Sequence, residues 1–294
     1  MIKFQLAAFS DEASLDLMEQ IAACKTHGVT HIELRNYSIN GGPQKNSSDT
    51  TIEEAKEIKA ILDANDMKVS AIGSKYGKIE IDEDFIPHFE AFKNTVEVAK
   101  ILGTDRIRMF SFFFTKGQSI DLYREEVIRR VRVMAEYSYA RGVLCCHENE
   151  KDIYGDIADR CVDLHKELGE ILGGVFDPSN YIQCGEDTIE AYAKVSPYIT
   201  YFHIKDCQKS DGYVVPAGHG DGNIGILLTE YAKKGENLIV TMEPHLKVFE
   251  GLAALDKDSD EKAESNDKYN FKDNLESFAF ACGAYYEVLS SINK

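Results

Sequence analysis

The chain has 294 residues, with 33 Lys and Arg against 50 Asp and Glu, so its formal net charge is −17. This excess of acid argues against a nucleic-acid partner and against an anionic membrane surface, because both require a basic face. Hydrophobic residues make up 44% of the chain, a globular value, and the length fits one large α/β barrel or two small domains.

The cysteines point to a reducing compartment. There are seven of them, Cys145 and Cys146 are adjacent, and no CxxC occurs, so neither a disulfide framework nor a structural zinc site is expected. No apolar run approaches the roughly 18 residues of a membrane span, and the N-terminus is a poor signal peptide. We therefore expect a soluble cytoplasmic protein.

Short apolar runs alternate with helical patterns along the whole chain. Eight of these runs have the length of buried parallel strands. They lie at Phe4–Phe9, Thr30–Leu34, Lys68–Ile72, Arg106–Phe110, Val143–Glu148, Gly174–Asp177, Ile199–Ile204 and Leu238–Glu243.

Apolar residues at helical spacing fill the gaps between these runs. Thr51 with Glu54 three residues later is the spacing of a capping box, which predicts a helix that begins there. The other predicted helices cover Ser14–His27, the stripe from Phe85 to Ala99, the stripe from Tyr123 to Met134 that ends near Gly142, and the stripe from Phe271 to Ile292.

Eight β–α alternations predict a (β/α)₈ barrel that takes up residues 1–294 as a single domain. A doubly wound sheet is the rival, but the first βα turn, SDEAS, lacks the GxGxxG of that fold. Two polar insertions follow predicted strands, at residues 36–49 and 256–270. The second lies between the last strand and the final helix, either as a solvated loop or as a lid over the C-terminal face of the barrel.

Four consecutive predicted strands end on an acid or an imidazole. The segments are HENE at 147–150, FDP at 176–178, HIKD at 203–206 and EPH at 243–245. Side chains two apart along a strand share a face, so Glu148, Asp177, His203 and Glu243 are predicted to converge at the barrel mouth. Three carboxylates and one imidazole suit a hard divalent cation, with Mn²⁺ favoured and Mg²⁺, Co²⁺ or Zn²⁺ as alternatives.

Each of these residues also has a structural interpretation, since a strand-end acid can cap a helix or pair with a lysine, and a lone histidine can be a core residue. Their occurrence at four successive strand ends favours the metal site. Without a cation, clustered carboxylates repel one another and partly protonate.

Other polar residues near strand ends keep two interpretations each. Lys205 shares a face with His203 and either reaches substrate or is a solvated rim residue. Arg108 either pairs with Glu148 or binds a substrate anion. Lys75, in the segment GSKYGK, either holds a sugar oxygen or phosphate or belongs to an ordinary loop. Glu33 and Arg35, at the end of the second strand, are equally ambiguous.

The order of these motifs resembles the xylose isomerase-like TIM-barrel superfamily of sugar (phosphate) isomerases and epimerases. The resemblance covers essentially the whole chain and rests on HENE at 147–150, FDPSN at 176–180, FHIKD at 202–206, PAGHGDG at 216–222 and TMEPH at 241–245. It implies that Glu148, Asp177, His203 and Glu243 are the metal ligands. It also implies that Glu148 and Glu243 are an acid/base pair that moves a proton beside a polarised carbonyl through an enediolate.

The chain departs from the pattern at two positions. Many members have His where this chain has Asn180, and many have Glu where it has His219. We take both positions as candidate substrate contacts.

The sequence therefore predicts a metal-dependent isomerase or epimerase of a small sugar, keto-sugar or sugar phosphate. A dehydratase or lyase acting on an inosose or keto-sugar is the first alternative, and a non-catalytic sugar-binding barrel is the second. A DNA-cutting relative of the AP-endonuclease branch is rejected, because the chain has only eight His and a charge of −17. A homodimer stays open, because barrels of this kind often dimerise although the residues carry no interface signature.

Overall fold

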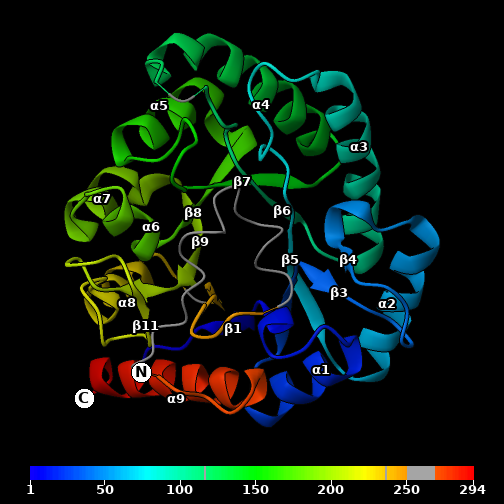
Figure 1. The fold of residues 1–294 in the computed structure, drawn as a ribbon, viewed down its shortest axis with the longest axis vertical. Coiled ribbons are helices and arrows are strands. Elements are labelled where there is room, and N and C mark those ends of the chain that lie inside the picture. The colour runs from blue at the N-terminus through cyan, green and yellow to red at the C-terminus, as the bar shows by residue number, and fades with distance from the viewer. Residues whose placement is uncertain (116, 236, 250–268) are drawn as a thin grey trace.

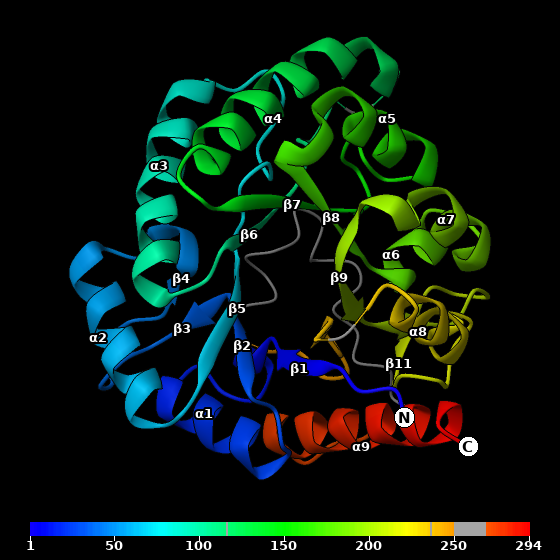
Figure 2. The same cartoon turned by 180° about the vertical axis from the view of Figure 1, so that it is seen from behind.

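Eight parallel strands close into a barrel in the computed structural model, which describes residues 1–115, 117–235, 237–249 and 269–294. Around the barrel the strands follow the order β1-β12-β9-β8-β7-β6-β5-β2 (Figures 1 and 2). Their bounds are β1 Gln5–Ala8, β2 His31–Leu34, β5 Lys68–Gly73, β6 Arg106–Met109, β7 Leu144–Glu148, β8 Leu172–Phe176, β9 Ile199–Ile204 and β12 Ile239–Met242. The predicted (β/α)₈ barrel is confirmed.

Helices surround this barrel on the outside, and Figure 1 views the molecule nearly along the barrel axis. They are α1 Leu17–Thr26, α2 Ile52–Ala64, α3 Phe85–Leu102, α4 Arg124–Tyr139, α5 Ala158–Leu168, α6 Pro178–Gln183, α7 Thr188–Val195, α8 Ile224–Ala232 and α9 Asn274–Ile292. The final helix begins at Asn274 rather than Phe271, because the Asp273 carboxylate caps it by accepting the Glu276 backbone N–H.

Five of the predicted strands end one residue away from the observed ends, and two of these ends bear on the site. Asp177 lies just beyond β8, and its carboxylate caps α6 by accepting the Asn180 backbone N–H. Pro178 is the first residue of that helix, a position that suits proline. Glu243 likewise follows the last residue of β12, Met242. Both side chains therefore stand on the C-terminal rim of the sheet, where loops and helix starts meet.

The polar insertion at 36–49 is ordered. It forms a small antiparallel pair, β3 Asn36–Tyr37 with β4 Lys45–Asn46, followed by a 3₁₀ turn at Ser47–Asp49. Of the second insertion, 256–270, only Tyr269 and Asn270 belong to the described residues.

A second hairpin follows β9 in the chain and consists of β10 Asp206–Cys207 and β11 Val214–Val215. The Asp206 carboxylate accepts backbone N–H groups from Gly218, Gly220 and Gly222 at 2.8–3.1 Å. A Cβ atom at Gly220 would lie only 2.4 Å from Asp206 Oδ1, so this tight wrapping requires glycine.

The hydrophobic core has three parts, of which the smallest is a cluster of Leu246, Phe271 and Ala281. A large outer part lies between the sheet and the helices, and a smaller part fills the barrel interior. The interior part consists of Ala7, Ala71, Cys146, Val175, Tyr201 and Ile239. Because side chains alternate along a strand, residues two positions after Cys146, Val175 and Tyr201 point into the same interior, one layer nearer the C-terminal rim. Those residues are the predicted Glu148, Asp177 and His203.

All seven cysteines are free, and six of them are buried. Their burial fits a role in packing rather than cross-linking. Among the helices that the structure describes, none has both the length and the apolar character that crossing a membrane requires.

The contribution of the capping box at the start of α2 to stability can be tested by mutation. The Thr51 hydroxyl accepts the Glu54 backbone N–H at 3.2 Å, and the Glu54 carboxylate accepts the Thr51 backbone N–H at 2.9 Å. Thr51→Ala should lower the free energy of unfolding by about 1 kcal/mol, measured by urea denaturation. Thr26→Ala is the control, because its exposed hydroxyl only donates back to the Ala22 carbonyl. An equal loss in both variants would contradict the capping interpretation.

Candidate metal centre

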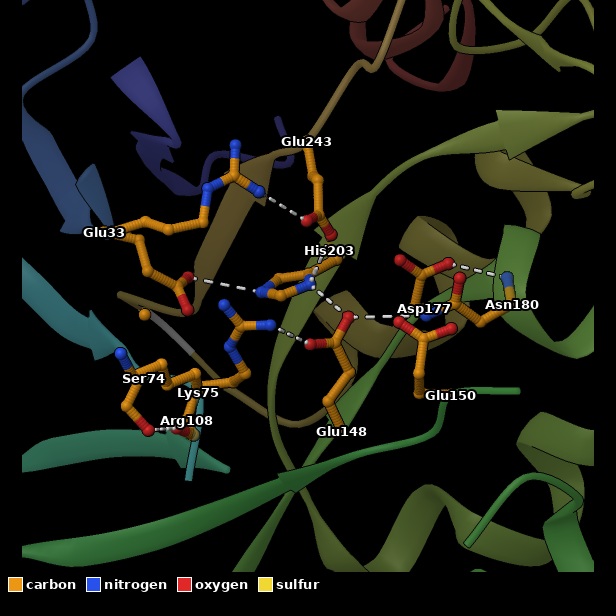
Figure 3. Close-up of polar contacts among 12 residues, drawn as sticks. Glu33, Ser74, Lys75, Arg108, Glu148, Glu150, Asp177, Asn180, His203 and Glu243 are labelled. Atoms are coloured by element: carbon orange, nitrogen blue, oxygen red, sulfur yellow. Dashed lines mark hydrogen bonds and ion pairs between the residues drawn. The ribbon is translucent and has the colours of Figure 1, made fainter. Parts of the chain in front are cut away.

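Four buried side chains meet inside the C-terminal end of the barrel. They are Glu148, Asp177, His203 and Glu243, and one ligand atom from each lies within 4.8 Å of the others. None is more than 3% exposed. Figure 3 shows their polar groups turned toward a common centre. The four residues that strand alternation predicted are thus brought together.

Each carboxylate of this group is held by a cation. Arg108 Nη1 donates to Glu148 Oε2 at 2.8 Å, Arg35 Nη1 donates to Glu243 Oε1 at 3.0 Å, and Lys205 Nζ lies 2.9 Å from Asp177 Oδ2. The two arginines leave the second oxygen of each glutamate directed toward His203. These oxygens, Glu148 Oε1 and Glu243 Oε2, lie 2.9 and 3.1 Å from His203 Nδ1.

The donor set fits a hard divalent cation. Asp177 Oδ2 and Glu243 Oε2 are fully buried, and neither accepts a hydrogen bond of good geometry from the described residues, although Lys205 lies near both. Buried carboxylate oxygens without such partners are costly unless they coordinate a cation. Oxygen-rich ligand sets of this kind suit Mg²⁺ and Mn²⁺, and the histidine also admits Zn²⁺ and Co²⁺.

The buried charges around the cluster reinforce this conclusion. Six buried carboxylates face three buried permanent cations in the described part of the barrel mouth. The carboxylates are Asp11, Glu12, Glu33, Glu148, Asp177 and Glu243, and the cations are Arg35, Arg108 and Lys205. The excess of negative charge must be balanced by protons or by a bound cation.

Burial is the largest influence on the carboxyl pKa values, and neighbouring charges decide the net direction. Burial, with repulsion from Glu243 and Glu148, raises the pKa of Asp177 to about 7. For Glu148 burial acts in the same direction, but His203 and Arg108 outweigh it and lower its pKa to about 2. Asp177 is therefore the carboxyl of this pair that holds a proton most readily.

Burial and neighbouring charges also act in opposite directions on the pKa values of Glu243 and His203. Burial alone would raise the pKa of Glu243, but Lys205 and His203 outweigh it and hold that pKa well below its ordinary value. Burial alone would lower the pKa of His203, but Glu148 and Glu33 raise it well above its ordinary value. In the absence of a cation, the imidazole therefore carries a proton that a metal would have to displace.

Arg35 binds three carboxylates on one side of the site. Its guanidinium is fully buried, with its carbon 4.1 Å from the centre of the Phe9 ring. Besides Glu243 it donates to Asp11 Oδ2 at 2.9 Å and to Glu12 Oε1 at 3.2 Å. Sequence reasoning left Arg35 ambiguous and missed the two acids, although they stand in the first βα turn, where a barrel places site residues.

His245 joins the same network. Its backbone N–H donates to Glu12 Oε2 at 2.8 Å, and its Nε2 lies 3.4 Å from Glu243 Oε1. Its φ of 44° is left-handed, which is uncommon for a residue other than glycine. The strained backbone turns this imidazole back toward Glu243.

The remaining predicted residues divide into two groups. Arg108 pairs with Glu148, and Asn180 Nδ2 donates to the Asn149 carbonyl at 2.9 Å while lying 3.5 Å from Glu148 Oε1. Lys205 is also inside the cluster, as its contacts with Asp177 and Glu243 show.

Lys75 and His219 are not brought into the cluster. Lys75 is about half exposed and pairs with Asp49 at 2.9 Å, and His219 is exposed on the glycine-rich turn. Within the described part of the chain, neither makes a polar contact with the four clustered residues. They lie on the rim, so any contact with substrate would have to be peripheral.

The protonation pattern predicts that cation affinity depends on pH. Binding requires Asp177 as a carboxylate and His203 without its Nδ1 proton, so protons compete with the metal. We expect calorimetric titration to give clearly tighter Mn²⁺ binding at about pH 8 than at about pH 6, because the pKa of Asp177 is raised to about 7. Asp177→Asn, which keeps a neutral oxygen ligand, should bind more weakly and depend less on pH. Equal wild-type affinity at both pH values would contradict this protonation pattern.

Comparison with solved structures shows which fold the chain shares. A D-psicose 3-epimerase from Clostridium cellulolyticum H10, solved with D-tagatose, is 16% identical with a TM-score of 0.74, covering 98% of this chain and 99% of its own. The IOLI protein, solved with a zinc atom, is 15% identical with a TM-score of 0.73 and the same coverage.

A third similar structure is a probable 3-DHS dehydratase, AsbF, from Bacillus anthracis. It is 17% identical with a TM-score of 0.66, covering 82% of this chain and 92% of its own. At such identities these similarities show the fold alone. No curated protein sequence matches the chain significantly.

The family described as xylose isomerase-like TIM barrel matches residues 21–257, which include all four clustered residues. This match covers most of the chain, and the closed barrel with its buried carboxylate–histidine cluster agrees with it. The chain belongs to the xylose isomerase-like TIM barrel family.

Proposed function

We propose that the protein is a divalent-metal-dependent isomerase or epimerase that acts on a small sugar, keto-sugar or sugar phosphate. The observation that carries the proposal is the pair of buried glutamates, Glu148 and Glu243. Each turns one oxygen toward His203 Nδ1 and fixes the other on an arginine. The solved epimerase of the same fold supports the reaction class.

The cation would be held by Glu148, Asp177, His203 and Glu243, with Mn²⁺ favoured over Mg²⁺, Co²⁺ and Zn²⁺. When bound, it would supply polarisation of the substrate carbonyl and stabilisation of the negative charge of an enediolate. Every other part of the mechanism belongs to side chains of this chain.

The two glutamates are proposed to move the proton. One takes a proton from the carbon beside the carbonyl, and the other, which carries a proton taken up from solvent, delivers that proton to the opposite face. The first glutamate then releases its proton to solvent. Figure 3 shows the two glutamates meeting at the same edge of the His203 ring, with Glu243 above and Glu148 below in that view, so each carboxylate approaches the site from its own direction. Arg35 and Arg108 hold the two carboxylates in fixed orientations, so little reorganisation is needed during the reaction. Which glutamate acts first depends on substrate stereochemistry.

Substrate oxygens would be bound by the polar groups beside the cluster. We propose Lys205, Arg108 and Asn180 for this role because all three already contact the clustered carboxylates. Lys75 and His219 remain candidates for contacts at the rim.

A dehydratase or lyase that acts on an inosose or keto-sugar is the second candidate. The observation that favours it is the buried Lys205 ammonium, 3.5 Å from Glu243 Oε2. Such a group can donate a proton to a hydroxyl that leaves from the carbon next to the enediolate. The probable dehydratase among the similar structures supports the chemistry.

The metal assignment can be tested without knowing the substrate. Stripped protein reloaded with Mn²⁺ should retain about one ion per chain by elemental mass spectrometry. Glu148→Ala should lose that ion or hold it much more weakly, while Glu126→Ala, on the outer helix α4, should retain it. Wild-type protein that is folded but holds no metal would refute the assignment.

The proton transfer can be tested by exchange with solvent deuterium. Wild-type protein with Mn²⁺, screened against ketoses, inososes and their phosphates, should place deuterium on the carbon beside the carbonyl of its substrate. Glu243→Gln should reduce that rate by roughly 10²–10⁴-fold, because it removes a proton carrier. Glu126→Gln is the surface control.

The products separate the remaining alternatives. Deuterium in an isomerised or epimerised sugar supports the first proposal, and loss of water supports the dehydratase. Near-normal exchange in Glu243→Gln would refute the two-glutamate mechanism. Tight sugar binding with no exchange would support a sugar-binding barrel instead.

A further inference from the structure

The far side of the His203 ring is fixed by a carboxylate that the proposed chemistry does not use. His203 Nε2 lies 3.2 Å from Glu33 Oε2, and Glu33 Oε1 accepts the Tyr201 hydroxyl at 2.8 Å. All three side chains are at most 1% exposed. Figure 3 shows Glu33 and Glu148 at opposite edges of the ring.

Strand alternation explains why Glu33 is buried there. Its neighbours Ile32 and Leu34 belong to the outer core between the sheet and the helices, so Glu33 points into the barrel. Tyr201 belongs to the interior layer, two residues before His203 on β9. The three side chains therefore occupy the same interior, one from β2 and two from β9.

The two ring nitrogens consequently have different tasks. Nδ1 lies 2.9 Å from Glu148 Oε1 and 3.1 Å from Glu243 Oε2, on the side where the four ligand atoms gather. A metal takes the lone pair of an imidazole nitrogen, so the neutral ring must then carry its hydrogen on the other nitrogen. Here that nitrogen is Nε2, and the acceptor facing it is Glu33.

The surroundings leave the ring little freedom to turn. The Phe9 ring meets it edge-on with centres 5.2 Å apart, and the Tyr201 ring lies 5.5 Å away on the same strand. Glu33 itself has one oxygen on Tyr201 and the other on His203, so neither oxygen is directed to the ligand side.

We propose that Glu33, held in place by Tyr201, is a positioning residue that sets His203 for metal binding. It accepts the Nε2 hydrogen, which leaves Nδ1 as the ligand atom and fixes the ring plane. This inference rests on the proposed metal centre, and it assigns to the chain a carboxylate–histidine pair behind the four ligands.

The test is Mn²⁺ affinity measured by calorimetry on metal-stripped protein. Glu33→Ala should weaken binding roughly 10–100-fold, as loss of such a partner typically does. Glu33→Gln, whose amide oxygen can still accept the Nε2 hydrogen, should lose less. Tyr201→Phe should weaken binding several-fold, because Glu33 loses its support.

Tyr231→Phe is the matched control for Tyr201→Phe. Tyr231 is equally buried, but its hydroxyl donates to the Thr200 carbonyl, away from the cluster. It should change stability without changing Mn²⁺ affinity. If Glu33→Ala fails to fold by circular dichroism, the comparison of the two tyrosine variants decides the question.

A second readout reports the ring directly. In protein loaded with diamagnetic Mg²⁺, ¹⁵N spectra of the histidine rings should place the His203 hydrogen on Nε2, and this signature should be lost in Glu33→Ala. Unchanged affinity and an unchanged ring signature in folded Glu33→Ala would overturn this inference and leave the metal centre intact. Wild-type protein that binds no Mn²⁺ would overturn both this inference and the proposed metal centre.

Discussion

Carboxylates that meet inside a barrel repel one another, and burial removes the water that would screen them. This repulsion determines which side chains surround the cluster at the C-terminal end of the barrel. Arg35, Arg108 and Lys205 each neutralise one carboxylate of the cluster, and they leave an excess of negative charge that suits a divalent cation. The apolar layer beneath, which includes Tyr201 and Val175, closes the barrel interior from below. The fold thus concentrates negative charge where a cation can balance it.

The arginines do more than neutralise charge. Each holds one oxygen of a glutamate and leaves the other free to face the centre of the site. Arg35 is itself clamped by Asp11 and Glu12 and stacked on Phe9. A carboxylate held in this way loses little entropy on binding a cation or accepting a proton, which is the physical basis of a preorganised site.

Strand alternation and the position of strand ends were sufficient to predict the barrel and the convergence of the four clustered residues. The network around them could not be predicted in the same way. Asp11 and Glu12 lie in a 3₁₀ turn, Ser10–Glu12, where no period of two applies. Glu33 was recognised as a strand-end residue, but its partner His203 lies far along the chain, and the sequence does not reveal which strands face each other across the barrel. The position of Lys75 outside the cluster could not be predicted either, because the sequence does not indicate that Asp49 pairs with it.

The order of strands around the barrel also bears on how the protein folds. The four clustered residues come from β7, the residue after β8, β9 and the residue after β12. β12 pairs with β9 on one side and with β1, from the opposite end of the chain, on the other. Contacts between distant segments form late, because their loop-closure entropy is large. The pairing of β12 with β1 therefore closes the barrel late, and it brings Arg35, with Asp11 and Glu12, from the start of the chain to Glu243. A cation that needs Glu243 held in this way would bind the closed barrel more tightly than an open intermediate, and so would stabilise the native state.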